Sequence, residues 1–402
     1  MPTGAAYDEA IAWIAQHRHL ANDSQAWTEA VLDGGWAAPR WPLEWFGRGM
    51  SEVDARSVEA AFADQHLPGP GQDLYNLWAG TLVAAGSVAL KREVMREVML
   101  DRVGMCLLYS EPGAGSDLAS LRTTAVRDGD EWVINGQKVW TSGAQGADYG
   151  MLIARTNWDV PKHRGITFFW LPMRQPGVEV RPLRQATGDS RFNEVFITNA
   201  RIPDSHRMGD EGQGWMVLQT ALGYERALMG RVAAQSKTPS PAPLGRTAQA
   251  HGDIPRPDVS LVSLARECGR AGDPVMRQHL ARLYCLKMVN DWNGLRAKAA
   301  AKAGLASPAL SLGKLSMSGI LHYAGRVQGH ILGIAATLDG PSFPISRDAN
   351  YSQLNAYFTS IGGGTDEIQR NIIAERILGL PREPEPDRDL PFCSIPVGTG
   401  LR

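Results

Sequence analysis

The chain has 402 residues, of which 44% are hydrophobic, which is enough for a large core and too many for one ordinary compact unit. Its 41 basic and 42 acidic side chains give a formal net charge of -1 with no basic block, which excludes a nucleic-acid-binding surface. The cysteines form no CxxC pair, the histidines lack metal-ligand spacing, and neither a signal peptide nor a membrane span is indicated, so we expect a cytoplasmic protein without a metal site.

Residues 1–103 are predicted to form an N-terminal helical domain. Apolar residues recur there at helical intervals, for example Ala10, Ile11 and Ile14, and again within the charged run 91–102. Residues 34–49 are aromatic and rich in Gly and Pro, which indicates a loop inside this helical region.

Residues 104–208 are predicted to form a central β domain. Residues 131–134 read as a strand, and the Asn135-Gly136 pair that follows is typical of a hairpin turn. Residues 165–171 and 177–180 read as further strands. Short strands separated by turns favour a small antiparallel sheet.

Residues 209–385 are predicted to form a C-terminal helical domain, interrupted by a Ser-, Pro-, Ala- and Gly-rich loop at residues 235–257. Residues 386–402 are expected to form an irregular tail. The whole chain is therefore predicted to be an α+β protein in the order α, β, α.

Two segments of the central region point to chemistry. In residues 107–118, LLYSEPGAGSDL, a strand runs into a turn of small residues, whose backbone N–H groups let a planar ring or a phosphate approach closely. An ordinary β-turn would look similar. In residues 135–143, NGQKVWTSG, an indole stands beside two hydroxyls, which suits a flat heteroaromatic cofactor. The alternative is a buried Trp140 with capping hydroxyls.

Together these segments make the chain resemble the acyl-CoA dehydrogenase family, whose signature pairs a Glu-Pro-Gly-Ala-Gly-Ser-Asp run with an Asn-Gly-x-Lys-x-Trp-x-Ser/Thr run. The resemblance continues through residues 201–203 and 209–214 to residues 364–374, GTDEIQRNIIA. It covers most of the chain, and its motifs are specific.

The resemblance implies a subunit with an N-terminal helical domain, a central antiparallel β-barrel and a C-terminal helical bundle, with FAD between the last two. It implies that the hydroxyl of Ser142 lies near flavin N5 and that Ser116 contacts the thioester. The residues that it implies for binding the flavin are Leu107, Tyr109, Ser110, Gly115, Ser116, Trp140, Thr141, Ser142 and Thr365. Those that it implies for binding the acyl-CoA substrate are Ser116, Tyr224, Arg226 and Gly363.

The base that removes the α-proton of the thioester needs a separate argument. Members of the family carry this Glu either just before the C-terminal Gly-Thr pair, where this chain has Gly363, or in a Glu-Arg pair on the helix after the β domain, here Glu225-Arg226. Leu218 and Leu222 precede Glu225 at helical spacing, so Glu225 falls on an apolar stripe, which is unusual for a carboxylate. We expect Glu225 to be the catalytic base. A structural ion pair is the alternative, with Asp366 as the fallback base.

Two motifs of the symmetric family members are missing. Residues 227–244 and 258–282 hold no Arg-x-x-Phe-Gly run, and residues 327–333 keep Gln328 but lack the Gln-x-x-Gly-Gly-x-Gly cluster. In the family both motifs reach the FAD of the neighbouring subunit, where an arginine holds the phosphates in two bonds. The chain therefore resembles the heteromeric acyl-CoA dehydrogenases of steroid side-chain degradation. A homo-oligomer in which Arg246 or Arg282 supplies the charge is the alternative to such a heterotetramer.

The leading hypothesis is an FAD-dependent α,β-dehydrogenase of acyl-CoA that passes electrons to an electron-transfer flavoprotein. A non-catalytic partner subunit and a flavin oxidase or monooxygenase on the same fold are the alternatives. A base at Glu225 favours branched, long or bulky acyl chains.

Overall fold

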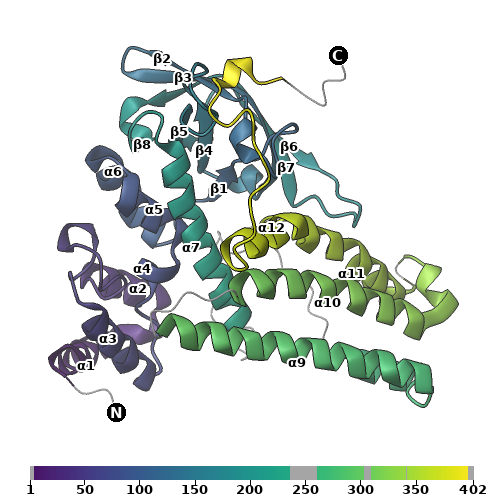
Figure 1. Cartoon of the computed structure of the whole chain (residues 1–402). Helices are drawn as coiled ribbons and strands as arrows, with labels where there is room; N and C mark the ends of the chain where they lie inside the picture. The colour runs from purple at the N-terminus through teal and green to yellow at the C-terminus, as the bar shows by residue number, and fades with distance from the viewer. Residues whose placement is uncertain (1–3, 236–259, 303–308, 341, 397–402) are drawn as a thin grey trace. The chain divides into compact units, whose positions relative to one another are not determined.

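A computed structural model describes residues 4–235, 260–302, 309–340 and 342–396 (Figure 1). The chain divides into two compact units. The first contains residues 1–183, 190–252 and 386–402, and the second contains residues 184–189 and 253–385. The loop predicted at residues 235–257 falls almost entirely outside the described residues.

The N-terminal region of the first unit is helical, as predicted. Side chains cap several of these helices at their N-termini: Asp23 accepts backbone N–H bonds at α2, Ser51 at α3 and Ser87 at α6. Trp27 and Phe62 lie in one buried core with the apolar faces of the helices. The helices are α1 (Ala5–His17), α2 (Ser24–Asp33), α3 (Glu52–Asp64), α4 (Gln72–Tyr75), α5 (Leu77–Ala85) and α6 (Val88–Met99).

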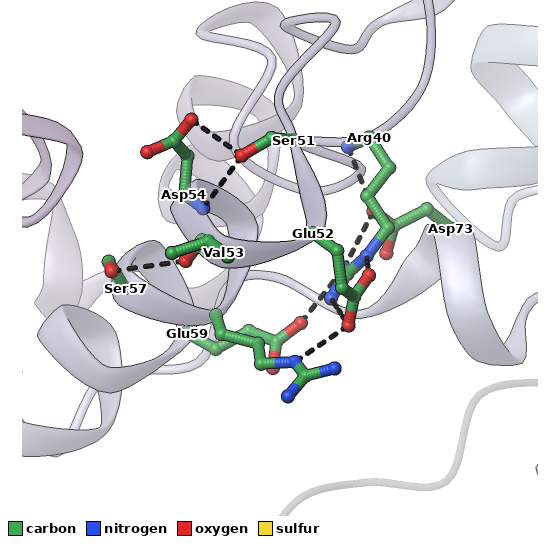
Figure 2. Close-up of polar contacts among 9 residues, drawn as sticks. Arg40, Ser51, Glu52, Val53, Asp54, Ser57, Glu59 and Asp73 are labelled. Carbon is green, nitrogen blue, oxygen red and sulfur yellow. Dashed lines mark hydrogen bonds and ion pairs between the residues drawn. The ribbon is translucent and has the colours of Figure 1, made fainter. Parts of the chain in front are cut away.

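A cluster of charged side chains connects the loop that carries Arg40 with helices α3 and α4 (Figure 2). The Arg40 guanidinium donates to Glu52 at 2.6 Å, to Glu59 at 2.9 Å and to Asp73 at 3.1 Å, and the Arg40 backbone N–H also donates to Asp73 at 3.0 Å. Burial works to lower the pKa of Arg40, but the carboxylates outweigh it and raise this pKa above its ordinary value. We call these four residues the Arg40 cluster.

The first unit also contains one eight-stranded sheet, in which the strands run in the order β6-β7-β3-β2-β4-β5-β8 and β1 pairs with β4. Its apolar inner positions form a second core around Trp132 and Phe169. The strands are β1 (Met105–Leu108), β2 (Thr124–Asp128), β3 (Glu131–Ser142), β4 (Tyr149–Arg155), β5 (Ile166–Pro172), β6 (Val178–Leu183), β7 (Phe192–Pro203) and β8 (Arg207–Met208).

The fold class is confirmed, but the expected closed antiparallel barrel is wrong in two respects. First, β1 pairs with β4 in parallel, and β2 meets β4 in parallel at one residue pair. Second, the end strands of the sheet, β6 and β8, do not pair with each other among the described residues. Closing a barrel needs end strands long enough to pair with a stagger, and β8 has two residues.

The hairpin expected at Asn135-Gly136 is also wrong, because β3 runs straight through this pair and the turn lies at Gly129 and Asp130. The pair instead marks a register shift in the pairing of β3 with β7, where the Asn135 side chain accepts the Asn199 N–H at 2.8 Å. A side chain at position 136 would come within 2.4 Å of the Thr123 hydroxyl. Glycine is therefore required here for a close approach rather than for a turn.

Helix α7 (Gly214–Gln235) follows the sheet and packs against β5 and α5 within the first unit. Leu218 and Ala221 on this helix are buried, and both belong to the core that contains Phe62 and Phe168. The helix therefore joins the apolar core of the N-terminal helices to one face of the sheet.

The second unit consists of helices, with α10 packed against α9, α11 and α12. Its core is aliphatic and includes Leu283, Ile320 and Val327. Within the described residues, no helix has the length and apolar character that a bilayer crossing needs. The helices are α8 (Ser260–Glu267), α9 (Pro274–Lys302), α10 (Ala309–Leu332), α11 (Pro344–Ile361) and α12 (Asp366–Arg376).

Candidate active site

The two segments singled out in the sequence lie side by side in the first unit. The Val139 N–H donates to the Ser110 carbonyl at 2.9 Å, so β3 contacts the chain directly after β1. Beyond Ser110, Glu111 and Ala114 exchange two backbone bonds of 3.0 Å and close a tight turn. The sequence therefore brings both segments to one place, at the end of β1.

A buried ion pair fastens these segments together, and sequence reasoning missed it. The Lys138 ammonium is fully buried and donates to Glu111 at 2.8 Å and to the Tyr109 carbonyl at 3.1 Å. The Glu111 carboxylate also accepts the backbone N–H groups of Arg122 and Thr123. Burial works to raise the pKa of Glu111, but the Lys138 charge and the N–H groups outweigh it and lower this pKa.

A second buried cation that sequence reasoning missed supports the turn at residues 118–120. The fully buried Arg155 guanidinium donates to the carbonyls of Ala119, Leu121 and Lys162 at 2.6 to 3.1 Å. It also lies 3.7 Å from the ring centre of Phe392, so the C-terminal tail packs on the sheet rather than trailing from it. Burial lowers the pKa of Arg155 to about 10. The available signal was a charged residue within or at the end of a strand, Lys138 in residues 135–143 and Arg155 after the apolar run at residues 150–154.

Trp140 is held on the surface by a β-bulge. The pairing of β3 with β7 shifts between Lys138 and Thr141, and Trp140 adopts a left-handed backbone conformation with φ of 62°. A bulky residue rarely adopts this conformation, and it often marks a functional site. The indole is 56% exposed and meets Phe192 edge-on, so the alternative of a buried Trp140 is wrong. One broad face of the ring can receive a flat partner.

Two hydroxyls of these segments are buried without a hydrogen-bond partner among the described residues, Tyr109 Oη and Thr141 Oγ1. Such atoms are rare in folded proteins and call for an explanation. A flavin ring, with polar atoms along its edge and a flat apolar face, matches two such hydroxyls and an exposed indole. The residues of the first unit therefore fit a flavin.

Glu225 lies on α7, one turn after the buried Ala221, and its side chain is half-buried. Burial raises the pKa of the Tyr109 hydroxyl, and the Glu225 charge raises it further, which places the carboxylate near Tyr109. The structure thus brings Glu225 to the same region of the first unit as the segment that carries Tyr109.

Tyr224 and Arg226 flank Glu225 on α7, and the structure describes the side chain of Tyr224. The Tyr224 ring packs against Gly80 of α5, its hydroxyl interacts with the Trp41 side chain, and burial raises its pKa. Tyr224 therefore anchors α7 to the N-terminal helices. The Arg226 side chain lies outside what the structure describes.

The other predicted residues of the first unit lie along the same two segments. Gly115 and Ser116 are exposed on the turn, whereas Leu107, Ser110 and Ser142 are half-buried. The Thr141 carbonyl accepts the Asn193 amide at 2.9 Å, a bond from β7 that no sequence pattern indicates.

Gly363 and Thr365 belong to the second unit. Thr365 is the N-cap of α12, and its hydroxyl oxygen accepts the Ile368 N–H at 3.2 Å. Gly363 is exposed, and its φ of 67° is a conformation that favours glycine. Thr365 therefore starts α12, and Gly363 lies in the loop that precedes it.

Comparison with known proteins agrees with the family resemblance of the two segments. Residues 106–200 match the acyl-CoA dehydrogenase middle domain, and residues 244–378 match the acyl-CoA dehydrogenase C-terminal domain. The chain is 34% identical over 377 residues to acyl-CoA dehydrogenase IpdE1 of Mycobacterium tuberculosis, covering 90% of this chain and 89% of IpdE1.

Two solved structures share the fold. One, described as Tcur3481-Tcur3483 steroid ACAD, aligns with a TM-score of 0.66 at 26% identity, over 95% of this chain and 99% of that chain. The other, the ChsE4-ChsE5 complex from Mycobacterium tuberculosis, aligns with a TM-score of 0.61 at 28% identity, over 94% and 97%.

Proposed function

Because this chain belongs to the acyl-CoA dehydrogenase family, and is therefore an oxidoreductase with a flavin cofactor, we propose that it uses FAD to remove the α and β hydrogens of an acyl-CoA thioester. The observation that carries the proposal is the position of Glu225. Its half-buried carboxylate lies near Tyr109, in the same unit as the two segments that fit a flavin. We also propose that the three domains comprise residues 1–103, 104–208 and 209–385.

The first unit supplies most of the groups that would hold the flavin. The hydroxyls of Tyr109 and Thr141, which lack partners among the described residues, would gain them from the ring edge, and Trp140 would cover one face. Bound FAD would accept a hydride from the β-carbon at its N5. The remaining residues that we assign to the flavin are Leu107, Ser110, Gly115, Ser116, Ser142 and Thr365.

Glu225 would accept the proton from the α-carbon. A base must reach that proton directly, and a carboxylate partly withdrawn from water is less stabilised by solvent and accepts a proton more readily. The backbone N–H of Gly363 would donate to the thioester oxygen and stabilise the negative charge that develops there. Ser116, Tyr224 and Arg226 would contact the rest of the acyl-CoA.

A pair of matched variants tests the base. Glu225→Gln should retain flavin and bind acyl-CoA, but dehydrogenation should fall by about 10²–10⁴, which is what a positioned base contributes. Glu211→Gln, at an exposed position just before α7, is the control and should keep full activity. The assay is a panel of straight-chain, branched and alicyclic CoA esters with an artificial electron acceptor. Full activity of Glu225→Gln would remove Glu225 from the mechanism.

We further propose that the chain works with an unlike subunit on a bulky, steroid-like acyl group and passes electrons to an electron-transfer flavoprotein. Two similar structures support this proposal, since their descriptions name a steroid ACAD and a complex of two unlike proteins. Helix α9 exposes large apolar side chains, including Tyr284, Trp292 and Leu295, and exposed apolar patches of this kind mark interaction surfaces. Arg282, one candidate for a replacement phosphate ligand, lies over the Tyr323 ring at 5.3 Å.

The subunit composition can be measured directly. The chain expressed alone should hold little FAD, because the motifs that reach a neighbour's cofactor are missing. Co-expression with an unlike subunit should restore the flavin, with one complete site per pair. Native mass spectrometry with flavin absorbance reports both quantities. A homotetramer with one FAD per chain and full activity would contradict the heteromer. Arg246, the other candidate phosphate ligand, lies outside the described residues.

A further inference from the structure

Helix α10 presents three polar side chains on one face, Lys314, Ser318 and His322. Their spacing of four residues places them above one another along the helix. All three bond to residues next to the three-glycine loop at residues 362–364, which joins α11 to α12.

Ser318 ties the two ends of this loop together. Its hydroxyl is buried with no exposed surface, donates to Asp366 Oδ2 at 2.7 Å, and lies 3.0 Å from Ser360 Oγ. Ser360 stands two residues before Gly362, and Asp366 stands two residues after Gly364. One hydroxyl on α10 therefore holds the last turn of α11 and the first turn of α12.

The outer members extend the same network. His322 Nε2 lies 2.6 Å from Ser360 Oγ, and the Lys314 ammonium donates to Asp366 Oδ1 at 3.2 Å. Because Ser318 gives its one proton to Asp366, it can only accept from Ser360, whose hydroxyl also lies 3.4 Å from the Ala356 carbonyl. Lys314 and Ser318 both donate to the Asp366 carboxylate, and Ser360 links Ser318 to His322.

The loop between these anchors needs such support. Gly363 and Gly364 have φ values of 67° and 89°, and the space around Gly363 is open. Successive glycines leave the backbone free to adopt many conformations. Within the loop, the Gly363 carbonyl accepts the Gln369 side chain only at 3.5 Å. The orientation of the Gly363 N–H therefore depends on how firmly the loop ends are held.

We propose that Ser318 is a positioning residue for dehydrogenation, and that by fixing Ser360 and Asp366 it orients the Gly363 N–H toward the thioester oxygen. The inference rests on the proposed function. An oxyanion donor is effective only when it is held within hydrogen-bond distance of the developing charge. Asp366 belongs to this network, with Lys314 and Ser318 as partners, which argues against it as the fallback base.

The test uses the full chain assembled with flavin and its partner. Ser318→Ala removes the shared hydroxyl, and Ser346→Ala is the matched control, since Ser346 is also buried but lies near the start of α11, roughly 20 Å along the helix from Ser360. KM is measured with the best CoA ester of the panel, together with two further quantities. The first is the rate of flavin reduction on rapid mixing. The second is the infrared band of a ¹³C-labelled thioester carbonyl, bound to Glu225→Gln protein with and without Ser318→Ala.

Ser318→Ala should slow flavin reduction about tenfold, less than the 10²–10³ lost when a donor is removed outright. KM should change less than twofold, and the carbonyl band should move to higher wavenumber because the thioester is less polarised. Ser346→Ala should change none of these. If Ser318→Ala does not assemble, Ser360→Ala is the second variant, because it removes the contacts of Ser360 with Ser318 and His322. It should change the reduction rate and the carbonyl band in the same direction but by less.

Unchanged rate and band in the folded variant would overturn the inference while leaving the dehydrogenase in place. A wild-type protein that oxidises no CoA ester of the panel would instead overturn the proposed function.

Discussion

The first unit contains two clusters of oppositely charged side chains, the pair of Lys138 with Glu111 and the Arg40 cluster. They differ mainly in how deeply their side chains are buried. Lys138 and Glu111 are almost completely buried, and both bond to the backbone around the two flavin-type segments. In the Arg40 cluster, one cation serves three carboxylates, of which only Asp73 is fully buried while Glu52 is half-exposed (Figure 2). We therefore expect burial, rather than the number of ion pairs, to decide how much the stability of the fold depends on each cluster.

The largest effect is expected from Lys138→Met. The substitution leaves the Glu111 carboxylate buried without its cation and the Tyr109 carbonyl without its donor. Removing one partner of a buried pair costs about 3–5 kcal/mol, so urea unfolding should show a loss of that size. Because both segments lose their link, flavin should also be lost on dialysis.

Replacing both partners distinguishes charge from packing. In Lys138→Met with Glu111→Leu no buried charge is left, so part of the stability should return relative to Lys138→Met alone. Arg201→Met, which breaks exposed pairs with Asp128 and Glu131, is the control and should have no measurable effect. If Arg201→Met were as damaging as Lys138→Met, burial would not be the deciding variable.

The order of helical and β regions could be predicted from the sequence because periodic apolar positions depend on local geometry alone. The helix that carries Glu225 is an example, since Leu218 lies buried on it as its spacing required. The proximity of the segments around Tyr109 and Trp140 could also be predicted, because the family resemblance ties both to one cofactor.

Features that depend on the pairing of distant residues could not be predicted. Asn135-Gly136 has the composition of a turn, yet the approach of Thr123 makes it a bulge inside β3. Lys138 looks like an ordinary exposed lysine until the fold buries it beside Glu111, 27 positions earlier. The sheet likewise stays open because β8 is short, and no local sequence pattern predicts the length of β8.

An intermediate effect is expected from Arg40→Met. Asp73 would lose the guanidinium but keep the Arg40 backbone N–H at 3.0 Å, so its buried carboxylate is only partly deprived of partners. We expect a loss of about 1–3 kcal/mol in urea unfolding, the range for a buried polar group left unsatisfied. Hydrogen exchange should quicken in α3 and α4 while the sheet is unaffected. A loss equal to that of Lys138→Met would mean that burial does not set the size of the effect.

The smallest effect is expected at Glu52 and should depend on pH. The hydrogen bond from Arg40, with another from Arg56, lowers the pKa of Glu52 to about 2, against about 4.3 in an unfolded chain. Since the folded pKa is the lower one, the stabilisation is complete above about pH 5 and disappears as the pH falls toward 2. Solvent and salt screen a half-exposed pair, so Glu52→Gln should cost less than about 1 kcal/mol at pH 7.

Urea midpoints at pH 7, 5 and 3 measure this difference, with Glu44→Gln as the control because Glu44 is an exposed carboxylate shortly before α3. The gap between wild type and Glu52→Gln should narrow on acidification and also in 1 M salt, whereas Glu44→Gln should follow the wild type throughout. A gap that stays constant with pH would mean that Glu52 contributes through packing. The exposed part of the Arg40 cluster would then stabilise the fold without any contribution from charge. It would differ from the buried pair of Lys138 and Glu111 in the type of interaction and not only in its size.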